Sequence, residues 1–126
     1  MGVVGSGGSA AEWFRRGRRN LRAARAMLDL GMADMAAFHA QQAAEFVLKA
    51  VQIHRNGRFS RTHDLPSLAA KVSAPPRIMK LASLLTPAYV SARYPDSVGP
   101  KITKRRGETY LQAARRIVRW ARRQLL

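Results

Sequence analysis

Apolar residues recur at intervals of three and four along most of this chain, which is the spacing of one face of an α-helix. Within residues 10–30, for example, the apolar stripe contains Phe14, Leu21, Ala24 and Leu28. No segment alternates apolar and polar residues for long enough to predict a sheet. The sequence therefore predicts an all-α fold in which amphipathic helices pack into a bundle.

Start and stop signals divide the chain into helices and loops. Ser9 followed by Glu12 is a capping-box pattern for the first helix, and Gly31 suits its end. Asn56-Gly57 predicts the end of the second helix, and Pro87 is expected to kink or divide the fourth. The predicted helices cover residues 10–30, about 33–54, about 65–71, about 76–93 and about 107–124.

Length and composition fit one domain. The chain has 126 residues, of which 47% are hydrophobic, so it can form one core but not two ordinary domains. Residues 1–9 contain four glycines and two serines, which predicts a disordered tail before a single domain over residues 10–126. The tail is too short and too flexible for a signal peptide, and no apolar run approaches the roughly 18 residues of a membrane span.

The chain has no cysteine. This excludes disulfides, thiol catalysis and cysteine-based metal sites. We therefore expect a cytoplasmic protein, and because no apolar run is long enough for a span, we expect no membrane to contain it.

The charge is strongly positive. The 23 lysines and arginines outnumber the 7 acidic residues and give a formal net charge of +16. Such a charge predicts an acidic partner: nucleic acid, nucleotide, anionic membrane or acidic protein. Arginine makes up 18 of the 23 basic residues, and its guanidinium binds phosphate in a bidentate way, which favours phosphate ligands. Genome composition or heat tolerance would also explain this arginine content.

Arginines form a second stripe on the first predicted helix. Arg15, Arg18, Arg22 and Arg25 follow one another at helical spacing. Such a stripe is often a solvated face, but like charges three and four residues apart repel one another. A bound anion that neutralises them is the alternative reading.

Four short segments resemble a known family. Residues 38–45 read Phe-His-Ala-Gln-Gln-Ala-Ala-Glu, Lys49-Ala50 follows, residues 62–65 read Thr-His-Asp-Leu, and residues 93–95 read Arg-Tyr-Pro. Together they resemble the HEPN family of prokaryotic helical domains. The resemblance implies an up-and-down bundle of four or five helices that usually pairs as a homodimer. Its members are often encoded beside a minimal nucleotidyltransferase, in modules like those of toxins and antitoxins; some bind nucleotides and others are metal-independent RNases.

The resemblance predicts a ligand site for a nucleotide or RNA phosphate. Its expected residues are Glu45, Lys49, His63, Arg93 and Tyr94. Glu45 would position Lys49 one helical turn away, His63 would orient the ligand, and Lys49, Arg58 and Arg93 would contact phosphate. Phe46 departs from the pattern, because many relatives have a lysine there; this removes one phosphate contact and suggests that the face meets a partner chain.

The leading hypothesis is a binding partner of a nucleotidyltransferase, and two alternatives remain. The first is a metal-independent RNase in which His63 moves protons and Arg58 stabilises the phosphorane. Four residues separate Arg58 from His63, which fits that branch of the family, but such a spacing also arises by chance among 18 arginines. Phe59 stands where the catalytic branch has a polar residue, and His63 could simply tie its loop to the bundle. The second alternative is a basic scaffold that binds nucleic acid without sequence preference.

No metal site or cofactor is expected. His39 and Glu45 are six residues apart and so share a helix face poorly. His54 is expected to interact with the dipole at the end of the second helix.

Overall fold

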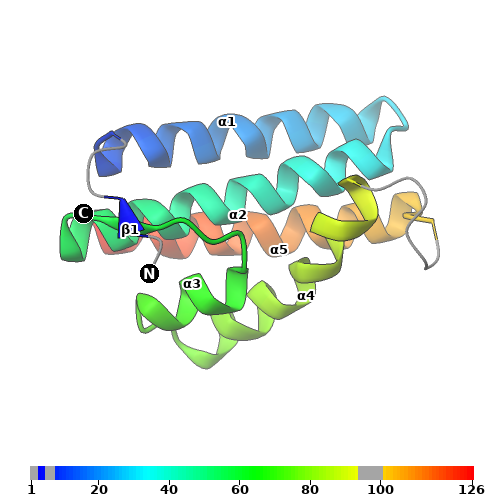
Figure 1. The fold of residues 1–126 in the computed structure, drawn as a ribbon. Coiled ribbons are helices and arrows are strands. Elements are labelled where there is room, and N and C mark those ends of the chain that lie inside the picture. The colour runs from blue at the N-terminus through cyan, green and yellow to red at the C-terminus, as the bar shows by residue number, and fades with distance from the viewer. Residues whose placement is uncertain (1–2, 5–7, 94–100) are drawn as a thin grey trace.

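The computed structural model describes residues 3–4, 8–93 and 101–126, with side chains for residues 8–88 and 101–126. These ranges contain five helices: α1 (Ala10–Asp29), α2 (Ala33–Asn56), α3 (Leu65–Lys71), α4 (Pro76–Arg93) and α5 (Lys104–Leu125). Three long helices, α1, α2 and α5, run side by side, while α3 and α4 cover α2 and α5 from the other side (Figure 1). The predicted all-α helical bundle is confirmed. None of the described helices is long and apolar enough to cross a membrane.

The helices α1 and α2 form a long antiparallel hairpin. The predicted capping box starts α1: the Glu12 amide donates to Ser9 Oγ, and the Ser9 amide donates to Glu12 Oε1, each over 3.1 Å. Gly31 adopts a φ of +80° in the turn, a conformation that glycine takes without steric cost. Buried Gly17 marks a close approach of the helices, since a Cβ there would lie 3.1 Å from the carbonyl oxygen of Ala43.

Helix α2 lies at the centre of the bundle, packed against α1, α5 and α4. Six of its seven alanines are therefore fully buried within this one chain: Ala36, Ala37, Ala40, Ala43, Ala44 and Ala50. Small side chains allow neighbouring helices to approach closely. These alanines are covered by the chain's own helices, so they do not form a face for a second copy.

Helix α5 begins earlier than predicted. It starts at Lys104 rather than near residue 107, because Thr103 caps it by accepting from the Arg106 amide over 3.1 Å. The basic residues 104–106 looked like the end of a loop in the sequence. Helix α4 continues through Pro87, which lies inside it.

Two short strands join the N-terminal segment to the loop before α3. Val3–Val4 (β1) pairs antiparallel with Phe59–Ser60 (β2). At Val3 and Val4 the structure thus has a paired strand within the segment whose composition predicted a disordered tail. Gln52 holds β2 against α2, since its Oε1 accepts from the Ser60 amide over 2.9 Å and its Nε2 donates to Ser60 Oγ over 3.1 Å. These bonds fix the loop that carries His63.

Candidate functional site

A buried carboxylate, Glu45, is the centre of the candidate site. Its Oε2 accepts from Lys49 Nζ over 2.8 Å and its Oε1 accepts from Gln41 Nε2 over 3.2 Å. His63 Nδ1 lies 2.9 Å from Oε2 and 3.0 Å from Oε1. The side chains of Glu45 and Lys49 are only 2% and 5% exposed, whereas that of His63 is 54% exposed. The cluster therefore links a buried ion pair to one histidine at the surface.

Helical spacing brings the first three members together. Gln41, Glu45 and Lys49 stand four residues apart on α2 and so lie on one face. His63 comes from the loop that the Gln52–Ser60 bonds hold against the same helix. The sequence predicted that Glu45 lies one helical turn from Lys49, but the burial of the two side chains depends on elements that are distant in the chain.

Aromatic rings enclose the Lys49 ammonium. Nζ lies 5.8 Å from the ring centroid of Trp13 and 5.5 Å from that of Phe59, both within the range of cation–π attraction. The Trp13 and Phe59 centroids are 4.7 Å apart, and Phe46 meets Trp13 edge-on at 5.2 Å. Phe46, the departure from the family pattern, thus packs against Trp13 of the same chain while it stays partly exposed. The aromatic cover and Glu45 stabilise a charge that burial alone would disfavour.

The carboxylate determines how His63 is oriented. An ionised carboxylate only accepts hydrogen bonds, so Nδ1 of His63 carries the proton that faces Glu45. The other ring nitrogen, Nε2, then lies on the side of the ring away from Glu45. A half-exposed imidazole that a buried carboxylate holds in one orientation is suited to meeting a phosphate or moving a proton.

One polar atom in this cluster has no partner. Gln41 Nε2 donates to Glu45, and Gln41 Oε1 is the one buried side-chain nitrogen or oxygen among the described residues that lacks a hydrogen bond. Such an acceptor costs roughly 1–3 kcal/mol.

The structure brings some of the predicted site residues together, and it does not describe all of them. Glu45, Lys49 and His63 meet directly. Arg58 is exposed and borders a shallow groove beside Gln52 and Ser60. The side chain of Arg93 and the whole of Tyr94 lie outside the described residues.

The two other histidines are not at this site. His39 Nδ1 lies 2.9 Å from Asn20 Oδ1, and burial lowers the pKa of His39. His54 is exposed and lies in the last turn of α2. The described residues contain no group of three histidine, aspartate or glutamate side chains that could hold a metal ion.

Comparison with known proteins identifies the family. The family model of the HEPN domain matches residues 10–124, nearly the whole chain. The chain belongs to the HEPN family. Among proteins with curated functions, none matches it.

Solved structures agree with this assignment. A protein of Thermus thermophilus is 33% identical, with a TM-score of 0.83 over 92% of this chain and 98% of its own. An archaeal HEPN homologue is 27% identical, with a TM-score of 0.81 over 94% of this chain and 99% of its own. An HEPN domain protein of Thermotoga maritima, 23% identical, shares the fold with a TM-score of 0.72 over 90% of this chain and 97% of its own.

Proposed function

We propose that this HEPN domain binds the phosphate group of a nucleotide or RNA and acts as a homodimeric partner of a minimal nucleotidyltransferase. The observation that carries the proposal is the Glu45–Lys49–His63 cluster, in which a buried ion pair holds a half-exposed histidine in one orientation. A buried ion pair contributes little to stability compared with apolar side chains of the same size, so its presence favours a functional role.

The geometry suggests how the roles divide. Lys49 is buried and already bonded to Glu45, so it acts on a ligand through the carboxylate rather than by direct contact. His63 and exposed Arg58 belong to the same loop and would meet the phosphate first. Arg93 and Tyr94 complete the proposed set, as the family pattern predicts.

Binding of a labelled mononucleotide and of a short single-stranded RNA to purified protein tests this function. We expect His63→Ala to weaken phosphate binding about tenfold or more, since a hydrogen bond to a charged group is worth roughly 1.5–3 kcal/mol. His54→Ala is the matched control, because it removes an exposed histidine elsewhere on the surface. Equal affinities for the two variants would contradict the proposed site.

The partnership needs its own test. The protein would be co-expressed with a nucleotidyltransferase encoded beside it, and the pair passed over a sizing column with light scattering. We expect a complex that contains two copies of this chain. A monomer that never associates with such an enzyme would exclude this part of the proposal.

A metal-independent RNase is the second candidate, and one contact favours it. Glu45 holds His63 through Nδ1, so the imidazole would take a proton from the RNA 2′-hydroxyl that attacks the scissile phosphate, or give one to the 5′ oxygen that leaves, while Arg58 stabilises the phosphorane charge. Incubating labelled RNA in excess EDTA with the original protein, Arg58→Ala and His63→Ala would decide between the candidates. Cleavage that both substitutions abolish would establish the RNase; binding without cleavage would leave the partner function.

A further inference from the structure

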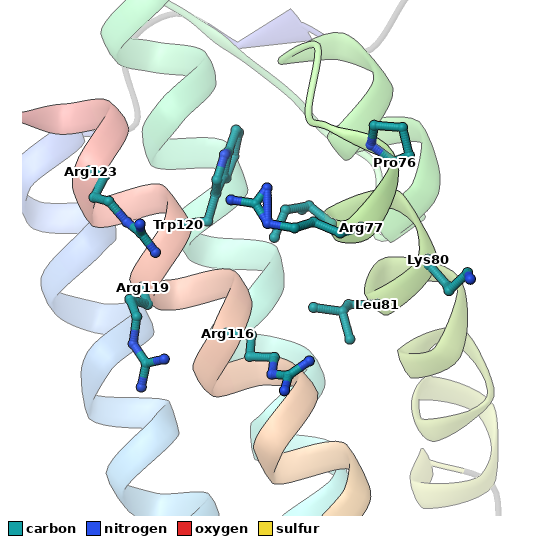
Figure 2. A pocket seen from close by; sticks show the side chains of 9 residues that line it. Pro76, Arg77, Lys80, Leu81, Arg116, Arg119, Trp120 and Arg123 are labelled. Atoms are coloured by element: carbon teal, nitrogen blue, oxygen red, sulfur yellow. The ribbon is translucent and has the colours of Figure 1, made fainter.

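A second cationic surface lies between α4 and α5. A groove of about 530 Å³ there is lined by five basic side chains: Arg77 and Lys80 from α4, and Arg116, Arg119 and Arg123 from α5. Leu81 and Trp120 lie between the two basic rows, and Arg77 extends from α4 toward Trp120 (Figure 2). The groove contains none of the residues of the Glu45 cluster.

The charges of this groove are uncompensated within the described part of the chain. No acidic residue lines it, and the salt bridges among the described residues involve other basic side chains, those of Arg25, Lys49 and His63. A sixth cation lies next to Trp120: the Arg55 guanidinium is 6.0 Å from the centroid of the Trp120 ring and donates to Gln124 Oε1 over 2.9 Å. Like charges gathered in this way repel one another, and a ligand with several negative charges would relieve the repulsion.

The spacing of the cations fits an extended ligand. Arg116, Arg119 and Arg123 follow at intervals of three and four, so their Cα atoms span roughly 10 Å along one face of α5 at about 1.5 Å per residue. Arg77 and Lys80 provide a second, shorter row on α4, three residues apart. Two basic rows beside an apolar floor would follow a phosphate backbone better than they would enclose one compact anion.

The floor of the groove limits base recognition. Trp120 is only 6% exposed and Arg55 covers one of its faces, so Trp120 does not offer a full stacking surface. Most of the binding energy would then come from phosphate contacts, which carry no sequence information. A concave groove of this kind also fits a single strand better than a flat membrane surface.

We propose that the α4–α5 groove binds the sugar-phosphate backbone of a single-stranded nucleic acid, without sequence preference. This inference takes its ligand chemistry from the proposed phosphate-binding function, but it places the strand on different side chains. The groove would hold the strand, while the Glu45 cluster would meet one phosphate elsewhere on the surface.

Fluorescence anisotropy with a labelled 12-nucleotide oligouridylate, at several NaCl concentrations between about 50 and 300 mM, tests the groove. In Arg116→Gln/Arg123→Gln we expect at least tenfold weaker binding near 100 mM. We also expect the slope of log K against log salt to be smaller in magnitude by about 1.4, because each phosphate contact on a single strand contributes about 0.7. The control Lys104→Gln/Arg105→Gln removes the same charge from exposed residues in the first turn of the same helix, and it should cost less than threefold.

Each other outcome has a definite meaning. Equal losses of RNA affinity in the two double variants would show that only the net charge matters and would overturn the proposal. A groove variant that retains its RNA affinity but no longer binds phosphatidylserine vesicles would overturn the proposal and would favour a membrane as the ligand. His63→Ala in the same assay separates the proposals: unchanged RNA binding in that variant would contradict only the Glu45 site, whereas wild-type binding by the groove variant would contradict only the groove.

Discussion

At the scale of single residues, the stability of the fold depends on the groups that donate hydrogen bonds to the buried Glu45 carboxylate. It is buried and accepts hydrogen bonds from Lys49, His63 and Gln41. Removing one partner of a buried ion pair leaves an uncompensated charge. We therefore predict that Lys49→Met lowers the free energy of unfolding by about 3 kcal/mol, measured by urea denaturation.

The double variant Glu45→Gln/Lys49→Met provides the control for this effect. It removes both charges while retaining side chains of similar volume, so we expect it to recover much of the lost stability. A double variant as unstable as Lys49→Met would show that the lysine acts through packing against Trp13 and Phe59 instead.

A second residue-scale prediction concerns pH. Asn20 Nδ2 donates to the carbonyl oxygen of Arg16, so Asn20 Oδ1 is the acceptor for the Nδ1 proton of His39. Burial lowers the pKa of His39 below its ordinary value of 6.5. The unfolded chain therefore binds this proton more readily, and the stability that neutral His39 contributes is lost as the pH falls below about 6.5 toward the lower folded pKa.

The measurement is the free energy of unfolding at pH 7.5 and pH 5.5. In His39→Gln, whose amide can still donate to Asn20, the decrease between the two pH values should be smaller than in the original protein. An identical decrease in His39→Gln and the original protein would exclude His39 as its source.

At the scale of helices, the contact between α1 and α2 depends on Gly17. A Cβ at this position would lie 2.5 Å from Val47 Cγ1 and 3.1 Å from the Ala43 carbonyl oxygen. Relieving that overlap requires the helices to separate, at a cost of about 1–3 kcal/mol. Alanine gains only roughly 1 kcal/mol over glycine within a helix, so the cost of separation outweighs this gain. We predict that Gly17→Ala lowers the melting temperature.

Gly107→Ala is the matched control for this contact. Its Cβ would meet the flexible end of Leu28 at 2.9 Å and Ala33 Cβ at 3.3 Å, so the neighbours can adjust. Thermal unfolding followed by circular dichroism should show the larger decrease for Gly17→Ala. The reverse order would mean that the hairpin tolerates separation better than its packing indicates.

Local signals explain which elements could be predicted from the sequence. The start of α1 was predictable because Ser9 and Glu12 complete its cap within four residues. The start of α5 was missed because its cap, Thr103, precedes a run of basic residues that also occurs in loops. The shared face of Glu45 and Lys49 followed from helical spacing, but their burial did not. Burial requires Trp13 from α1 and Phe59 from β2, whose approach depends on tertiary packing.

At the scale of the whole molecule, charge repulsion opposes folding. The chain carries +16, and among its described lysines and arginines only Arg25 and Lys49 form salt bridges. Salt screens interactions between exposed charges that are more than about 10 Å apart at 0.1 M. Because repulsive pairs outnumber attractive pairs in this chain, added salt should weaken repulsion more than attraction. We predict that raising NaCl from about 20 to 300 mM increases the melting temperature by about 5 °C, since 1 kcal/mol shifts it by roughly 2–8 °C in domains of this size.

The arginine stripe on α1 offers a way to locate this repulsion. Arg15, Arg18 and Arg22 are exposed and three to four residues apart, so each repels the next. In Arg15→Gln/Arg18→Gln/Arg22→Gln, the melting temperature at low salt should rise and its increase with salt should be smaller. If salt instead lowered the melting temperature of the original protein, attractive ion pairs would outweigh the repulsion. Relief of repulsion among the cations of the α4–α5 groove would then contribute less to the binding of a polyanion there.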